Sequence, residues 1–497
     1  MDDILVHRLE LSFNKRYKSI ALKKGSATYT YEELDLLSNK VANYLLKNFI
    51  DEKFIGVWAE KEFPTYSFII GILKAGKAYI PLNPKFPNAR NQQIINESQV
   101  KIILSANEIE YKNVSFSDLF INPDKVNYDN QRIKYKYQAD DPVYMLFTSG
   151  STGRPKGVLI KNNQLINYLD SVQNICNVNP DDILSHTFDL TFDLSVHDIF
   201  MTFINGATLC VPTENDLISP ANYIKSNKIT HWFSVPSLIR QMIKLKQLKT
   251  ENFLSIKNAL LCGEALSTDT ALNFKNSISK AAKIFNLYGP TEATISVTSY
   301  EIKTQPKELH GNISLGKVFK CNEFLILNDE NIASEVGELL LKGKQVIHSY
   351  FNKEINSNHF FTDSNGEIWY RTGDLVKKDG DGDIYYLGRK DAQVKLNGFR
   401  IELHEIENCI IRNFNFMNAI CFISENNNYS NLVSVIQSDK ELEISTIKSK
   451  LSELLPTYMI PKFFVFLKEF PHNSNRKIDR NAIKEWYQKE YAEKGIN

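Results

Sequence analysis

The segment Leu146–Val158 reads L-F-T-S-G-S-T-G-R-P-K-G-V and combines small residues with a single lysine near its end. Consecutive small residues let backbone N–H groups converge on an anion, so this loop has the composition of a phosphate cradle. In the common magnesium-binding P-loop, Lys and then Ser or Thr directly follow the last Gly. Here Arg154 and Pro155 separate Gly153 from Lys156. The segment therefore predicts a nucleotide site of another kind.

Four further short motifs follow this loop along the chain. They read N-L-Y-G-P-T-E at Asn286–Glu292, Y-R-T-G-D at Tyr370–Asp374, G-R-K-D at Gly388–Asp391 and N-R-K-I-D-R at Asn475–Arg480. In this order the set resembles the adenylate-forming superfamily of acyl-CoA synthetases, luciferases and the adenylation domains of nonribosomal peptide synthetases. The resemblance runs from about residue 28 to Lys477, and the ordered set is far more specific than any one motif.

The resemblance implies how these motifs divide the binding of ATP and Mg²⁺. The first loop, with Lys156, would hold the phosphates and stabilise the pyrophosphate leaving group. Tyr288 would stack on adenine, Asp374 would accept both ribose hydroxyls, and Glu292 would bind the magnesium ion, because a hard cation prefers oxygen. The implied ATP-binding residues are Thr148, Ser149, Gly150, Ser151, Thr152, Gly153, Asn286, Tyr288, Gly289, Thr291, Asp374 and Arg389.

Lys477 is implied to bridge the substrate carboxylate and the α-phosphate, two anions that must approach one another. Its motif departs from the family pattern in one residue, since Arg476 stands where Gly is usual. The resemblance also implies a hinge at Asp391, about which a C-terminal domain turns to present a loop with Lys395 and Gly398 to a thiol acceptor. The catalytic residues expected on this basis are Lys477, Lys156 and Glu292.

The segment T-F-D-L-S-V-H-D-I-F at 191–200 bears on the substrate. Asp193 falls where amino-acid-activating members place an acid against the substrate ammonium, which would be costly to bury without a partner. The alternative interpretation is a structural Asp at a helix start. The pocket implied by the resemblance comprises Asp193, Leu194, His197, Ser234, Leu260, Cys262, Leu287, Ile295 and Ser296.

This pocket leaves the amino acid open. Asp193, Leu194, Ser234 and Cys262 match the D-alanine:D-alanyl carrier protein ligases, as does a length without an attached condensation or carrier domain. Its three leucines equally resemble the pockets of free-standing L-proline activators. Glycine, serine and threonine also stay open as substrates, because one methylene in an apolar pocket changes the binding free energy by only about 1–3 kcal/mol. The expected acceptor is the phosphopantetheine thiol of a separate carrier protein. An acyl-CoA synthetase that uses a non-amino acid is the alternative.

Secondary-structure signals indicate the elements that would position these motifs. Thr30 and Glu33 form a capping-box pattern ahead of apolar residues at helical spacing up to Phe49. Short apolar runs alternating with helical patterns predict an α/β fold of layered subdomains with largely parallel strands. Closely spaced strands from Phe324 predict an added β-rich subdomain. A boundary at Asp391 predicts a large domain over 1–390 and a small, mobile α+β domain over 391–497. In the small domain we expect one helix that begins at Ile401 and a second, solvent-exposed helix near the C-terminus.

Composition narrows the class of protein. The 59 Lys and Arg residues nearly balance 58 Asp and Glu residues, which argues against global attraction to nucleic acid or a membrane surface. No export signal or long apolar run is visible, so a cytoplasmic protein without a membrane span is expected. Six scattered cysteines without a C-x-x-C pair predict reduced, mostly buried thiols. The stretch Asp379–Asp383 imitates a calcium loop, but Lys390 at its twelfth position predicts a turn between strands instead.

Overall fold

The computed structural model describes residues 4–107, 120–121, 129–133, 135–149, 155–352, 359–426, 429–439, 442–472 and 478–492. The chain divides into two compact units. The first comprises Met1–Pro84, Ser98–Phe147 and Gly157–Lys390, and the second comprises Lys85–Glu97, Thr148–Lys156 and Asp391–Asn497.

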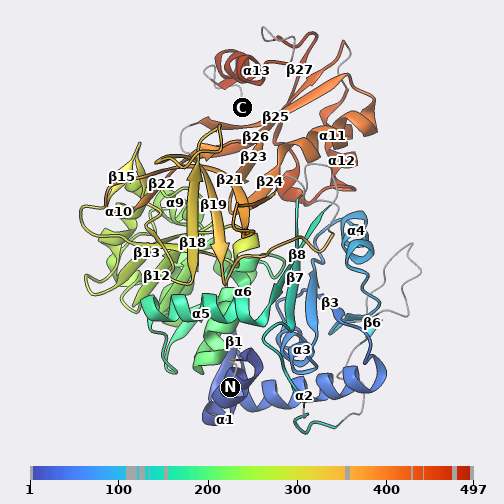
Figure 1. Ribbon diagram of the computed structural model, residues 1–497, viewed down its shortest axis with the longest axis vertical. Helices are drawn as coiled ribbons and strands as arrows, with labels where there is room; N and C mark the ends of the chain where they lie inside the picture. The colour runs from blue at the N-terminus through green and yellow to red at the C-terminus, as the bar shows by residue number, and fades with distance from the viewer. Residues whose placement is uncertain are drawn as a thin grey trace. The chain divides into compact units, whose positions relative to one another are not determined.

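The first unit contains a nine-stranded sheet in the order β17-β14-β13-β12-β11-β9-β10-β1-β2. Its neighbouring strands β12 and β13 lie side by side in Figure 1. Strands from β13 to β1 in this order pair in parallel, and antiparallel pairs stand at both edges. The bounds are β1 (Ile20–Lys24), β2 (Ala27–Thr30), β9 (Ile183–Ser185), β10 (Thr208–Val211), β11 (His231–Ser234), β12 (Asn258–Leu261), β13 (Lys283–Tyr288), β14 (Thr298–Glu301) and β17 (Lys317–Val318).

A six-stranded sheet has the order β6-β5-β3-β4-β7-β8. Its strand β3 pairs in parallel with both β4 and β5, as expected for strands joined by helical crossovers. The bounds are β3 (Phe54–Trp58), β4 (Ala78–Leu82), β5 (Ile103–Leu104), β6 (Phe120–Ile121), β7 (Pro142–Thr148) and β8 (Lys156–Lys161). The predicted layering with largely parallel strands is therefore confirmed.

Helices of the first unit pack on these sheets with their apolar residues buried. Helix α2 begins at the predicted capping box, where the Thr30 side chain accepts from the Glu33 backbone N–H, and it buries Leu34, Val41 and Leu45. The helices are α1 (Leu5–Arg16), α2 (Tyr31–Asn48), α3 (Phe63–Lys74), α5 (Asn162–Cys176), α6 (Asp193–Asn205), α7 (Glu214–Ile218), α8 (Pro220–Asn227), α9 (Pro236–Lys244) and α10 (Thr268–Ser277), with short turns η2 (Thr250–Asn252) and η3 (Thr291–Ala293).

The predicted β-rich subdomain is an antiparallel sheet in the order β18-β19-β21-β20, with β22 also paired to β21. A small pair, β15 (Glu308–Leu309) with β16 (Asn312–Ile313), forms its own two-stranded sheet in contact with β22. The stretch 379–383 is the turn between β21 and β22, as its sequence predicted. The bounds are β18 (Asn322–Leu327), β19 (Val336–Gly343), β20 (Phe360–Thr362), β21 (Ile368–Lys378) and β22 (Ile384–Arg389).

The second unit contains a hairpin of β23 with β24 and the sheet β25-β26-β27. The predicted helix from Ile401 begins two residues late, because Ile401 and Glu402 end strand β24. The bounds are α4 (Asn88–Ser98), β23 (Gln393–Leu396), β24 (Phe399–Glu402), α11 (Leu403–Phe414), β25 (Asn418–Asn426), β26 (Tyr429–Gln437), α12 (Ile444–Ser452), η5 (Thr457–Met459), β27 (Phe463–Leu467), α13 (Arg480–Tyr487) and η6 (Gln488–Ala492).

The predictions for the C-terminal helix and for the cysteines can be compared with the structure. The C-terminal helix α13 is not solvated all round, because Ile483 and Tyr487 are buried and the Tyr487 ring contacts Phe422. All six cysteines are free thiols, and four of them are buried. Within the described part of the chain, no helix is long and apolar enough to cross a membrane. The α/β fold class is confirmed, whereas the mobility of 391–497 stays a prediction.

Candidate functional site

Three of the predicted nucleotide-binding residues of the first unit form one buried cluster. The Tyr288 hydroxyl donates to Asp374 Oδ2 at 2.5 Å, and Arg389 donates to Asp374 Oδ1 at 2.9 Å. Asp374 lies directly opposite Arg389 in the β21–β22 pair, and Tyr288 ends β13. Burial first, and then the Asp374 carboxylate, raise the pKa of Tyr288 well above its ordinary value, so the phenol stays protonated and keeps donating. A buried carboxylate next to an aromatic ring can accept the hydroxyls of a nucleoside.

Two neighbouring positions of the same motif shape the backbone. The Asn286 side-chain amide donates to the Ser314 carbonyl at 2.9 Å, which fixes it inside the protein. At Gly289 a Cβ atom would lie 2.4 Å from Ser296 Cα, so this position tolerates no side chain. In the structure both residues thus hold the loop in place, and contact with a nucleotide stays a prediction for them.

Glu292 is completely buried within the short turn η3. The Tyr350 hydroxyl donates to its Oε1 at 2.7 Å, and the Ile347 backbone N–H donates to its carbonyl at 2.9 Å. A carboxylate offers about four acceptor positions and is the kind of oxygen ligand that a hard cation prefers. The donor chemistry of Glu292 therefore fits Mg²⁺. Tyr350 was not among the predicted residues.

The turn after η3 has a strained backbone, and hydrogen bonds from Gln345 stabilise it. Thr294 and Ile295 both have left-handed backbone angles, with φ of 55° and 72°, which is unusual for a β-branched residue. The buried Gln345 amide donates to the Ser296 carbonyl at 2.9 Å, and the Gln345 carbonyl accepts from the Thr294 hydroxyl at 2.6 Å. Its side-chain oxygen accepts from Asn322 at 2.7 Å. Gln345, which the motifs did not indicate, thus positions a turn that carries two predicted pocket residues.

The remaining predicted pocket residues come from α6 and from the ends of neighbouring strands. Asp193 is the first residue of α6, which agrees with a helix-start role, and its contact with a substrate ammonium stays a prediction. Leu194 follows directly and His197 lies one turn after Asp193, and both are buried. Ser234 ends β11, and Leu260 and Cys262 lie at the end of β12, its parallel neighbour, with Leu287 in β13. The carboxyl ends of parallel strands are where α/β proteins commonly bind ligands.

Tyr168 of α5 contacts the predicted pocket residue His197, although the sequence analysis did not predict a role for it. Its hydroxyl lies 2.8 Å from His197 Nδ1. Figure 1 shows α5 beside α6, and the two helices are in contact. A tyrosine at helical spacing on a buried face carries no sequence signal that distinguishes it from ordinary core.

Some of the predicted site residues belong to the second unit. The Ser149 hydroxyl donates to the Arg400 carbonyl at 3.1 Å, so part of the glycine-rich loop contacts the predicted thioester-step loop. That loop is the β23–β24 hairpin, in which Lys395 pairs with Arg400, and its two turn residues, Asn397 and Gly398, have φ of 50° and 82°. An Asn-Gly pair suits such a turn. Lys156 is buried at 3% exposure.

Several predicted residues lie outside the described residues, namely Gly150, Ser151, Thr152, Gly153 and Lys477. The segment that follows Lys477 is described. The Asp479 carboxylate caps α13, and Arg480 donates both to the buried Glu407 carboxylate and to the Cys421 carbonyl. Those bonds fix the chain directly after Lys477.

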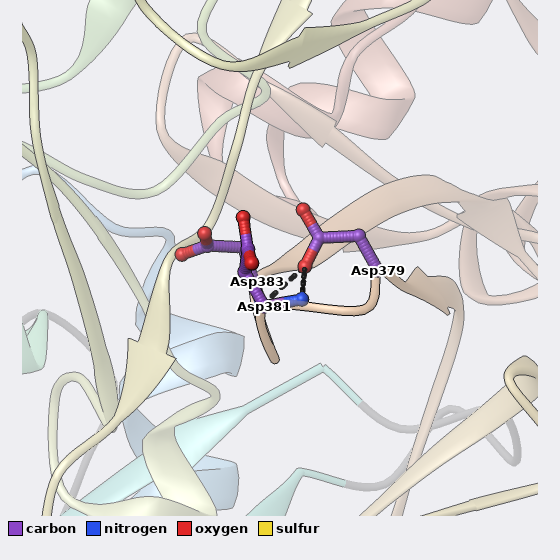
Figure 2. Close-up of side chains that lie close together, drawn as sticks. All are labelled: Asp379, Asp381 and Asp383. Carbon is purple, nitrogen blue, oxygen red and sulfur yellow. Dashed lines mark hydrogen bonds between the residues drawn. The ribbon is translucent and has the colours of Figure 1, made fainter.

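Asp379, Asp381 and Asp383 are the three carboxylates that imitate a calcium loop (Figure 2). Lys307 Nζ donates to them at 3.4, 2.7 and 2.5 Å respectively. An ammonium group therefore stands where a metal ion would be needed to offset their charge. The arrangement supports the predicted turn.

The sequence is similar to a known enzyme family and to known peptide synthases. The pattern of the AMP-binding enzyme family matches residues 9–351. Zwittermicin A synthase ZmaJ of Bacillus cereus is 32% identical over 92% of this chain and 90% of its own length. Gramicidin S synthase 1 of Brevibacillus brevis is 29% identical over 97% of this chain, which spans only 44% of that protein.

A solved structure is similar over nearly its whole length. The Vibrio cholerae adenylation domain AlmE, in complex with glycyl-adenosine-5'-phosphate, superposes with a TM-score of 0.86 at 26% identity, covering 98% of each chain. The predicted membership and the fold class agree with both kinds of comparison.

Proposed function

Because this chain belongs to the AMP-binding enzyme family, we propose that it activates a small amino acid, of about the size of D-alanine, and passes it to a carrier-protein thiol. The fold and family are those of ATP-dependent amino acid adenylation domains. The amino acid and the acceptor are the proposed parts. The observation that carries the proposal is the buried cluster of Tyr288, Asp374 and Arg389, a site that suits a nucleoside.

In the proposed first step a carboxylate oxygen of the amino acid bonds to the α-phosphorus of ATP while pyrophosphate leaves. Asp374 would accept the ribose hydroxyls, and Glu292 would hold Mg²⁺, which offsets phosphate charge when it is bound. Lys156 would hold the phosphates, and Lys477 would bridge the two anions. In the second step the phosphopantetheine sulfur bonds to the acyl carbon and AMP leaves, with Lys395 and Gly398 near the thiol.

Recognition of an amino acid rests on Asp193. A carboxylate at the start of α6 can pair with the substrate ammonium, which would otherwise be desolvated without a partner. The match of Asp193, Leu194, Ser234 and Cys262 to D-alanine ligases favours a small side chain. The glycyl adenylate in AlmE, a protein similar to this chain, agrees with a small substrate.

Amino-acid-dependent ATP–pyrophosphate exchange tests this proposal directly. The panel contains D-alanine, L-alanine, glycine, L-serine, L-threonine and L-proline, together with the matching acids that lack the amine. Exchange with a small amino acid is expected, and it should be lost in Asp193→Ala and Lys477→Ala. The matched controls are Asp181→Ala and Lys280→Ala, two exposed residues that should leave exchange unchanged.

The remaining outcomes separate the alternatives. Exchange only with acids that lack the amine would make the protein an acyl-CoA synthetase, and CoA would then replace the carrier protein as acceptor. Exchange with L-proline alone would keep adenylation and overturn the D-alanine-like size. Incubation of the purified enzyme with ATP, the active amino acid and phosphopantetheinylated carrier protein tests the second step, with thioester detected by intact-protein mass spectrometry.

A further inference from the structure

A buried ion pair joins helices α4 and α11 within the second unit. Arg90 Nη1 donates to Glu405 Oε1 at 2.8 Å, and the two side chains are only 4% and 5% exposed. Arginine and glutamate are almost never fully buried unless they are paired. Removal of one partner would leave a buried charge without compensation, which is strongly unfavourable. The pair therefore fixes two segments of the second unit to each other, although 315 positions separate its residues in the chain.

Glu405 lies in the first turn of α11, directly after the hairpin that carries two residues predicted for the second step. Strand β24 ends at Glu402 and α11 begins at Leu403, so no loop separates the hairpin from Glu405. The β23–β24 hairpin contains Lys395 and Gly398. Because a strand that runs directly into a helix leaves few backbone torsions free, the position of Glu405 also determines where the hairpin lies.

Aromatic rings form a second contact between the hairpin and the segment that carries Arg90. The Phe399 ring of β24 stacks on Tyr458 of η5, with centroids 4.1 Å apart and an interplanar angle of 5°. Tyr458 also meets the Phe86 ring edge to face, with centroids 6.2 Å apart. Phe86 and Arg90 both belong to the short segment 85–97 of the second unit. This segment therefore holds the hairpin both through an ion pair and through aromatic packing.

The hairpin that is held in this way contacts the start of the glycine-rich loop. The Ser149 hydroxyl donates to the Arg400 carbonyl at 3.1 Å, and both residues belong to the second unit. Arg400 pairs with Lys395 across the hairpin. A loop predicted to hold phosphates thus contacts a hairpin predicted to meet the acceptor thiol. Thioester formation requires these two groups together, because the thiol must reach the carbon that is bonded to the adenylate.

We propose that Arg90 is a positioning residue for thioester formation, which through Glu405 holds the β23–β24 hairpin against the glycine-rich loop. This inference rests on the proposed function, because it concerns the second step of that reaction. In this step the thiol sulfur bonds to the acyl carbon, and the bond between that carbon and the phosphate oxygen breaks. AMP leaves with the bonding electrons, and the thiol proton passes to water. Arg90 acts only through the hairpin and not on the reacting atoms.

The two steps should respond differently to a change at Arg90, because Lys395 and Gly398 are predicted to act only in the second. Adenylation is measured by ATP–pyrophosphate exchange with the active amino acid. The second step is measured as the single-turnover rate at which adenylate already formed on the enzyme is converted to thioester by added pantetheine. Arg90→Met should lower the thioester rate by about tenfold or more, because a displacement of about 1 Å can cost that much. It should leave kcat/KM for exchange unchanged.

Two milder variants keep the inference testable if Arg90→Met does not fold, since that variant leaves the Glu405 carboxylate buried without its cation. Circular dichroism establishes whether each variant is folded. Arg90→Lys keeps the positive charge and should retain more of the thioester rate than Arg90→Met. Phe86→Ala removes a partly exposed ring from the aromatic contact, and it should lower the thioester rate without lowering exchange.

The matched control is Arg132→Met, which removes an arginine from another carboxylate, since Arg132 Nη2 lies 2.8 Å from Asp35 Oδ2 in the first unit. It should change neither rate. Equal losses of exchange and thioester formation in the Arg90 and Phe86 variants would mark a merely structural contact and overturn the inference, as would unchanged thioester rates. Absence of exchange with every amino acid, or of thioester with the unmodified enzyme, would instead refute the proposed function itself.

Discussion

Replacement of Gln345 by leucine tests whether one buried side chain holds the strained turn of the site. Leucine has nearly the same size, but it cannot donate to the Ser296 carbonyl or accept from the Asn322 amide, which lie 2.9 and 2.7 Å from the Gln345 amide atoms. Each buried polar group left unpaired costs about 1–3 kcal/mol. With two such groups, Gln345→Leu is expected to lower the free energy of unfolding by about 2–6 kcal/mol.

The assay is guanidinium unfolding followed by tryptophan fluorescence, together with KM for the active amino acid in the exchange reaction. Release of the turn should also raise KM, because Ile295 and Ser296 would leave their positions in the predicted pocket. Gln241→Ala serves as the control, since Gln241 is exposed on α9 and its loss should change neither quantity. The reasoning is refuted if the unfolding midpoint of Gln345→Leu equals that of the control.

Three further outcomes are expected. Asp374→Asn leaves the Arg389 guanidinium, whose side chain is 10% exposed, without its anion, so the free energy of unfolding should fall by about 3–5 kcal/mol and KM for ATP should rise. Unchanged denaturation and exchange kinetics would contradict this. Lys307→Met should lower the free energy of unfolding at neutral pH. The difference in this free energy between the variant and the unmodified protein should become smaller in acid. The reason is that, against the raising effect of desolvation, the Tyr385 hydroxyl, the Asp383 backbone N–H and then Lys307 hold the pKa of Asp379 below its ordinary 3.8. The part of this stabilisation that Lys307 supplies is present above pH 3.8 and is lost as the pH falls through the lowered pKa. Urea unfolding of both proteins at pH 3 and pH 7 measures this difference in the free energy of unfolding. Hydrogen bonding to Glu407 raises the pKa of His404 above 6.5, so this pair should stabilise the protein fully below pH 6.5 and lose its effect as the pH rises through the raised pKa. A pH series of unfolding midpoints should show that dependence, and His404→Gln should abolish it.

The amino-acid sequence by itself determined the family, the α/β class and the local elements. The capping box at Thr30 and Glu33 is decided within one helical turn, and the apolar runs that became β3, β4 and β12 are decided by local hydrophobicity. The motifs around Tyr288 and Asp374 could be found because each is a short continuous string. Their meeting 86 residues apart in the chain could be expected only through the family resemblance.

Only the tertiary structure decided which side chains support those motifs. Tyr350 reaches Glu292 across 58 residues, Gln345 reaches Ser296 across 49, and Tyr168 reaches His197 across 29. No local pattern marks such partners, because a buried glutamine or tyrosine is chosen by the geometry of elements that pack against it. The same holds for Lys307, which offsets the charge of Asp379–Asp383. Local strings specify elements and motifs, whereas sheet register and helix packing specify the contacts between them.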